Sequence, residues 1–108
     1  MPLALGQGLD GVDRGPAELR KGGLAKRITD EGWILNDLGD LSTPNALKHS
    51  GASNLWCAKE ISAVNKATAE ATYEQAKQHN FVVSLGGDHS MAIGSVAGIL
   101  KARPDAGT

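Results

Sequence analysis

Cysteine, aromatic residues and net charge are all scarce in this chain of 108 residues. The single Cys57 cannot form an internal disulfide, which is typical of a reducing compartment. A net charge of −1 argues against non-specific binding to nucleic acid or to an anionic membrane. No apolar run is long enough to span a bilayer, and no signal peptide precedes Pro2. We therefore expect a cytoplasmic protein with no nucleic-acid partner and no membrane partner.

Helical periodicity is the main pattern in the first two thirds of the chain. A helix is predicted from Pro16 to about residue 31, with an interruption at Gly22 and Gly23. A second helix is predicted over 56–78, where mostly small and apolar side chains recur at helical spacing. Its expected buried side consists of Ile61, Val64, Thr68, Ala71 and Gln75.

A third helix is predicted from about residue 91 to 101. Gly94 and Gly98 lie four positions apart, so the backbone of this helix can approach a neighbour closely. Apolar residues occupy much of its circumference, which predicts cover on more than one side: Ile93, Val96, Ala97, Ile99 and Leu100.

Two short apolar runs are predicted to be strands. Residues 81–85 are apolar on both faces, as expected of a parallel strand covered by helices, and 33–35 follow Gly32 as the other strand. Residues 39–55 are polar with little periodicity, which predicts a surface loop. The order of elements favours an α/β fold. Two strands alone are marginal in water, so we expect further structure beyond this chain.

The second strand runs into a turn that carries candidate chemistry. Gly86 and Gly87 allow a tight turn, and Asp88 or Ser90 can cap the helix that follows. His89 is then held at the C-terminal end of a strand, where open α/β sheets build their ligand sites. A lone histidine after a strand is more often a hydrogen-bonded structural residue. The spacing by itself leaves both interpretations open.

Residues 85–95, Leu-Gly-Gly-Asp-His-Ser-Met-Ala-Ile-Gly-Ser, closely resemble the first metal-binding motif of the arginase family of binuclear manganese ureohydrolases. Residues 11–16 with Leu19 and Arg20 resemble the helix start near the family's N-terminus. Residues 37–41 resemble the end of its second strand. The three matches occur in the family's order and span nearly the whole chain.

The resemblance implies a fold and a site. Residues 1–108 would be the N-terminal part of a single arginase-like domain, a fragment whose three-layer αβα parallel sheet is incomplete at both ends. The missing first strand would lie between the two predicted strands. His89 would be a metal ligand, and manganese the cofactor, with two ions per subunit in the complete enzyme. The family's later ligand motifs, Asp-x-His-x-Asp and Ser-x-Asp-x-Asp, do not occur here.

The implied activity is manganese-dependent hydrolysis of L-arginine to L-ornithine and urea, by a homo-oligomer that is expected to be a trimer. No catalytic residue is assigned within this chain, which is expected to be inactive alone. Two alternatives stay open. One is agmatinase or another guanidino-compound hydrolase, because the substrate is decided largely by residues absent here. The other is a truncated, non-enzymatic interaction module, since a single metal ligand is also compatible with it.

The remaining candidate residues favour structural roles. Gly6 to Gly11 match Gly-x-Gly-x-x-Gly, but the helix starts only at Pro16, so a loop is favoured over a nucleotide site. His49 and His79 are expected to be solvated and Cys57 to be packed. Arg14 and Arg20 are candidates for ion pairs on a helix face or between subunits. Asp88 is expected to cap or brace its turn rather than to bind metal.

Overall fold

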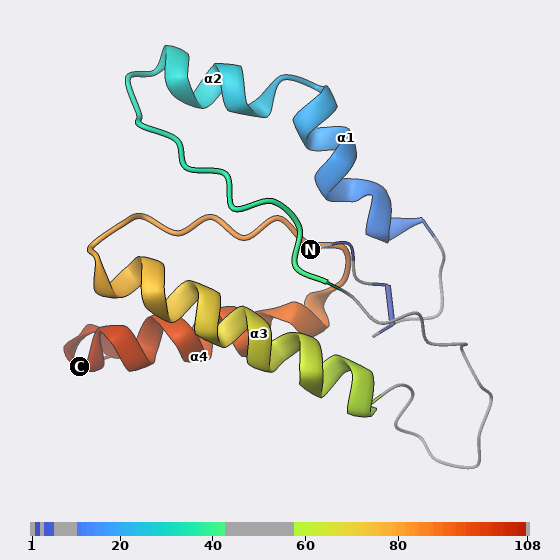
Figure 1. Cartoon of the computed structure of the whole chain (residues 1–108), viewed down its shortest axis with the longest axis vertical. Coiled ribbons are helices and arrows are strands. Elements are labelled where there is room, and N and C mark those ends of the chain that lie inside the picture. The colour runs from blue at the N-terminus through green and yellow to red at the C-terminus, as the bar shows by residue number, and fades with distance from the viewer. Residues whose placement is uncertain (1, 3, 6–10, 43–57, 108) are drawn as a thin grey trace.

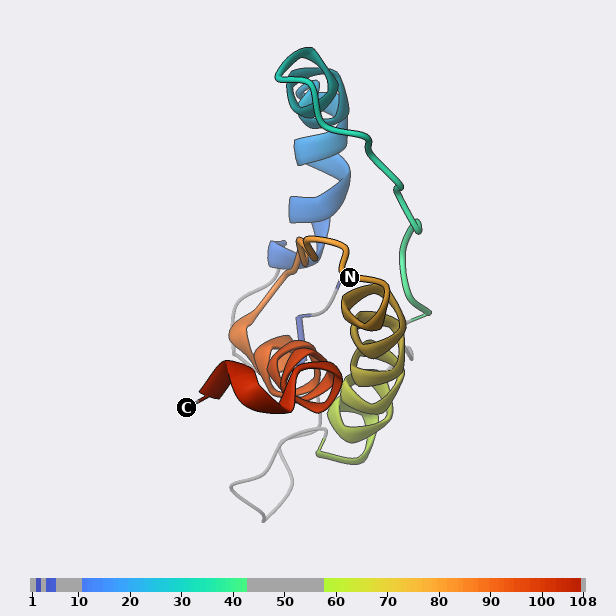
Figure 2. The same cartoon turned by 90° about the vertical axis from the view of Figure 1, so that its left-hand side faces the viewer.

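The structure is a computed structural model that describes residues 2, 4–5, 11–42 and 58–107. Helices dominate this part of the chain: α1 (Gly15–Lys21), α2 (Leu24–Asp30), α3 (Ala58–Lys77) and α4 (Ala92–Ala102). Short 3-10 helices lie at Val12–Arg14, His89–Met91 and Pro104–Gly107. Helices α1 and α2 form one end of the molecule, α3 and α4 the other, and the extended segments 33–42 and 80–86 lie between them (Figures 1 and 2).

The predicted interruption of the first helix is confirmed. Pro16 is buried in the first turn of α1, where its missing N–H costs nothing. Helix α1 ends at Gly22, and α2 begins after Gly23, whose φ of 89° is readily adopted only by glycine. Gly32, with φ also 89°, ends α2. The glycines therefore mark where α1 ends and where α2 begins and ends.

Helices α3 and α4 run side by side in the same direction, as Figures 1 and 2 show. A Cβ added at Gly94 would lie 2.3 Å from the Asn65 carbonyl oxygen, and one at Gly98 would lie 2.0 Å from Thr72 Oγ1. The close approach predicted from these two glycines is therefore confirmed. The 56–78 helix is confirmed over its described part, which starts at residue 58.

The buried side of α3 differs in part from the expected one. Val64 and Thr68 are buried as predicted, whereas Ile61, Ala71 and Gln75 are only half-buried. Thr72 and Ala76, one position beyond Ala71 and Gln75, are buried instead, and Asn65, next to Val64, is buried too. Helix α4 packs on this buried side of α3. Hydrophobicity alone could not locate the buried side, because three of its five residues are polar.

The strands predicted at 33–35 and 81–85 are wrong for the described residues, which are extended there but contain no strand. The rings of Trp33 and Phe81 lie 6.2 Å apart between centroids, so the two segments approach each other through side chains. A strand needs a hydrogen-bonding neighbour about 4.8 Å away, and the described residues supply none. An apolar run of this kind predicts an extended backbone, whereas a β-strand also needs a second backbone to pair with.

The predicted cover on several sides of α4 is also absent within the described residues. Ile93 is 70% exposed and Val96 54%, although the glycine face of the same helix is buried. Of the predicted loop 39–55, residues 39–42 have no regular structure and the rest lies outside the described residues. None of the described helices is both long and apolar enough to cross a membrane.

Candidate functional site

The turn between the extended segment 80–86 and α4 is held by Asp88. This side chain is 7% exposed, and its Oδ1 accepts a hydrogen bond from the Ser90 N–H at 2.9 Å and another from the Ser90 hydroxyl. Asp88 is thus the N-cap of the 3-10 helix His89–Met91, as predicted. Its carboxylate braces the turn.

Side-chain packing also holds the turn that carries His89. Met91 is buried, and a Cβ added at Gly86 would lie 1.6 Å from its sulfur. The start of α1 also touches the turn, because a Cβ at Gly15 would lie 3.2 Å from the Gly86 carbonyl oxygen. A side chain at position 86 would therefore displace the buried Met91 side chain from this turn.

A further bond holds the turn from α3. The Asn65 Nδ2 donates to the Ser90 carbonyl at 2.8 Å, and its Oδ1 accepts from the Gly94 N–H at 2.6 Å. Reasoning from the sequence missed this residue. The sequence offered one signal for it: Asn65 is a single asparagine beside the small and apolar residues of the predicted buried side of this helix.

His89 is exposed on this braced turn. No hydrogen bond or ion pair joins its ring to another residue in the described part of the chain. The imidazole is therefore free to act as one ligand, which fits the donor that a metal site would need here. Within the described ranges no group of three or more His, Cys, Asp or Glu residues could hold a metal ion. A single imidazole cannot hold one by itself.

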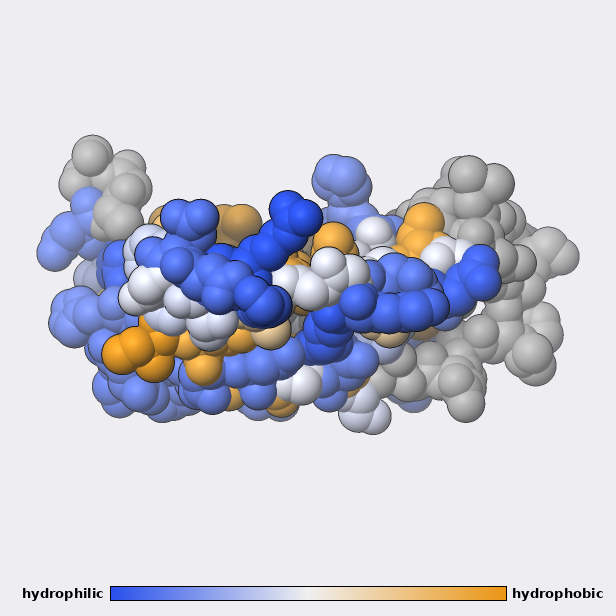
Figure 3. Space-filling view, turned by 90° about the horizontal axis from the view of Figure 1, so that it is seen from above, coloured by the Kyte–Doolittle hydropathy of each residue, from blue (hydrophilic) through white to orange (hydrophobic). Residues whose placement is uncertain are grey.

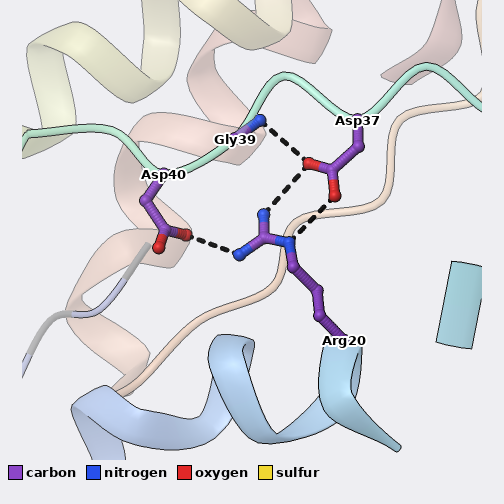
Figure 4. A network of polar contacts seen from close by, with 4 residues as sticks. All are labelled: Arg20, Asp37, Gly39 and Asp40. Atoms are coloured by element: carbon purple, nitrogen blue, oxygen red, sulfur yellow. Dashed lines mark hydrogen bonds and ion pairs between the residues drawn. The ribbon is translucent and has the colours of Figure 1, made fainter. Parts of the chain in front are cut away.

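A second polar cluster joins α1 to the segment 37–40 (Figure 4). The Arg20 guanidinium donates to both carboxylate oxygens of Asp37, at 2.9 and 3.0 Å, and to Asp40 at 2.8 Å. The Gly39 N–H also donates to Asp37, at 2.8 Å. Arg20 thus forms ion pairs, but with aspartates of the segment 37–40 rather than along its own helix face, and the sequence did not identify these partners.

The cluster shifts the protonation equilibria of its members. The hydrogen bond from Arg20, assisted by the Gly39 N–H, lowers the pKa of Asp37 to about 2. The same guanidinium lowers the pKa of Asp40, and the two aspartates raise the pKa of Arg20. The three groups stay charged over the whole physiological range. They join two segments of chain and do not surround His89.

The other candidates are dispersed. His79 is exposed at the end of α3 with a φ of 63°, and Arg14 is exposed beside Gly11. His49, Cys57 and the glycine motif from Gly6 to Asp10 lie outside the described residues. Among the described candidates, the polar contacts thus gather in the turn that carries His89 and around Arg20.

Comparison with known proteins adds the decisive observation. The family model of the arginase family matches residues 1–107. The chain belongs to the arginase family. It is 36% identical over 104 residues to rat arginase-1, covering 96% of this chain and 32% of that protein. It is 38% identical over 101 residues to the arginase of Bacillus subtilis, covering 94% of this chain and 34% of the relative.

A solved arginase structure agrees with this assignment. The crystal structure of arginase from Bacillus subtilis matches with a TM-score of 0.79 and 36% identity, over 94% of this chain and 31% of that one. The matching fold is an α/β fold, although the described part of this arginase-family chain is mostly helical and contains no strand. The chain spans about a third of the length of the curated relatives it matches.

Proposed function

We propose that residues 1–108 are the N-terminal part of a single arginase-like domain, and that the complete protein hydrolyses L-arginine to L-ornithine and urea with manganese. The family membership supports a hydrolase of the ureohydrolase kind. The observation that carries the proposal is the exposed His89 on a turn braced by Asp88. In this proposal the segments 33–42 and 80–86 belong to the parallel sheet of a three-layer αβα domain.

The role of this chain is to hold one imidazole in place. Manganese, when bound, makes a water molecule nucleophilic near neutral pH. His89 contributes a neutral nitrogen ligand, and carboxylates from later motifs of the complete protein supply the harder oxygen donors that manganese prefers. The hydrogen bonds of Asp88 brace the turn, and Gly86 leaves the space that Met91 fills. The proton shuttle and the groups that bind the amino-acid end of arginine lie outside this chain. We place the enzyme in the cytoplasm as a trimer.

The test is His89→Asn in the complete protein. We expect the variant to keep its fold but to lose one of two bound manganese ions and most of its turnover, because an amide is a poorer manganese ligand than imidazole. Metal content per subunit and urea release measure this. His79→Asn is the matched control, since asparagine tolerates the positive φ of this exposed position.

Two retained metal ions with unchanged turnover in His89→Asn would remove His89 from the ligand set. Assaying arginine beside agmatine distinguishes the arginase reaction from that of agmatinase. Absence of metal binding and of hydrolysis in the complete protein would favour a non-enzymatic interaction module.

Urea release by the 108-residue chain is a separate test. We expect none above a control that contains manganese alone, because the described residues supply no metal-binding group of three ligands. Release that His89→Ala abolishes would show that the chain carries the activity by itself.

A further inference from the structure

We propose that Asn65 is a positioning residue that fixes the turn bearing His89 from the neighbouring helix α3. This inference rests on the proposed function in one respect, namely that His89 is a metal ligand. Asn65 lies far from the motif in sequence, and its side-chain hydrogen bonds go to Ile61, Ser90 and Gly94 rather than to His89. It acts through the backbone of the turn and of α4.

The two ends of the Asn65 amide bond the turn and the start of α4. Its Nδ2 donates to the carbonyl of Ser90, the residue directly after His89, at 2.8 Å. Its Oδ1 accepts from the Gly94 N–H at 2.6 Å, and its Nδ2 also donates to Ile61 in its own helix at 3.1 Å. The residue is only 8% exposed. A buried amide is stable only when bonded, so these contacts hold its position strongly.

The bond to Gly94 meets a specific need of α4. The first N–H groups of a helix have no partner within the helix, and Gly94 is the third residue of α4. The N-cap residue of α4, Met91, makes no side-chain capping bond. Asn65 thus supplies from α3 the acceptor that the start of α4 lacks. Gly94 is needed for this approach, because a Cβ would lie 2.3 Å from the Asn65 carbonyl oxygen.

The turn is consequently fixed from two directions. Asp88 bonds the N–H of Ser90 from within the turn, while Asn65 bonds the carbonyl of the same residue from α3. Both peptide groups that flank Ser90 are anchored, and His89 is joined directly to the first of them. A ligand that is held before the metal arrives loses less freedom on binding, so loosening the turn lowers metal affinity.

The test compares two substitutions on the same buried face of α3 in the complete protein. Asn65→Leu keeps the approximate volume but removes all three bonds. Thr72→Val is the control, because Thr72 also faces α4, at Gly98, but its hydroxyl donates only to carbonyls of α3. Asn65→Ser is a milder second variant, whose hydroxyl can bond within α3, as that of Thr68 does, but cannot reach α4.

Two measurements on metal-free protein separate positioning from general stability. Titration with manganese alone should show a dissociation constant about tenfold higher for one site in both Asn65 variants, and a change below about twofold in Thr72→Val. Amide hydrogen exchange at Gly94 should accelerate about tenfold in the Asn65 variants only, because its acceptor is gone.

Each other outcome has a definite meaning. Equal loss of metal affinity in Thr72→Val and in the Asn65 variants would make the effect one of helix packing and overturn the proposal. Unchanged affinity with faster exchange at Gly94 would overturn it too, since the turn would then be loosened without consequence. Unchanged metal binding in His89→Asn, with affinity still lowered by Asn65→Ser, would instead overturn the ligand role of His89.

Discussion

Arg20 shows how one side chain can join distant parts of this chain. Its guanidinium binds Asp37 with two parallel bonds, the geometry that gives arginine its advantage over lysine with carboxylates. Both partners keep considerable exposure, 30% for Arg20 and 44% for Asp37. The contribution to stability is therefore small, and the main effect is to place the segment 37–40 against α1.

We expect Arg20→Gln to raise the pKa of Asp37 from about 2 towards its ordinary value of about 3.9. The folded pKa lies below the unfolded one. The stabilisation is therefore complete above about pH 4 and is lost as the pH falls through about 2. A carboxyl carbon NMR titration of Asp37 measures the shift.

Lys26→Gln is the control for this prediction. It breaks the exposed pair with Asp30, whose charged atoms lie 2.6 Å apart, and should leave the Asp37 titration unchanged. An Asp37 pKa that stays near 2 in Arg20→Gln would show that the Gly39 N–H, rather than Arg20, dominates.

At the scale of elements, the parallel pair α3 and α4 is the best-packed part of the described chain. Its interface consists of glycines on one helix and threonines, an asparagine and small apolar residues on the other. The buried threonine hydroxyls donate to carbonyls of α3 itself, as Thr68 does to Val64 at 2.7 Å. Polar side chains can therefore line this interface without an unsatisfied group.

We expect Gly98→Ala to destabilise the complete protein by about 1–3 kcal/mol, although alanine is the better helix former. Its Cβ would lie 2.0 Å from Thr72 Oγ1 and 2.4 Å from the Ala69 carbonyl oxygen. The addition of Thr72→Ala should not restore stability, because the backbone oxygen remains. Urea denaturation measures both changes.

Ala97→Ser, at an exposed position of α4, is the control for Gly98→Ala and should change stability by less than about 0.5 kcal/mol. A gain of stability in Gly98→Ala would mean that the helices separate at no cost. The close approach would then not be a constraint on this position.

At the scale of the whole molecule, apolar surface is the main feature left without cover among the described residues. Ile34 is 100% exposed and Phe81 81%, and Ile93 lies open on α4. The face in Figure 3 is mostly hydrophilic, with apolar atoms showing between polar side chains. Exposed apolar side chains such as Ile34, Phe81 and Ile93 usually mark an interface or a tendency to associate.

We expect the 108-residue polypeptide to self-associate, and Ile93→Lys to reduce that association. Light scattering coupled to size-exclusion chromatography measures the mass as a function of concentration. Ala97→Lys adds the same charge at an exposed neighbouring position without removing a large apolar side chain, so it should have a smaller effect. A monomer that unfolds cooperatively would contradict the prediction. If both variants reduced the association equally, the added charge rather than the loss of the Ile93 side chain would be the cause.

Short-range rules explain what could be predicted correctly from the sequence. The interruption at Gly22 and Gly23, the cap at Asp88 and the close approach at Gly94 each depend on neighbours within a few residues or on the absence of a side chain. The motif around His89 likewise indicated the family, because its residues are contiguous. These features were determined by the sequence itself.

Only the tertiary structure decided which distant groups meet. Arg20 lies 17 residues from Asp37, and Asn65 lies 29 residues from Gly94, so no local pattern identifies either pair. The apolar runs near Trp33 and Phe81 determined extended backbone but could not determine pairing. A strand exists only when another backbone lies beside it to exchange hydrogen bonds, and that neighbour is a property of the folded molecule.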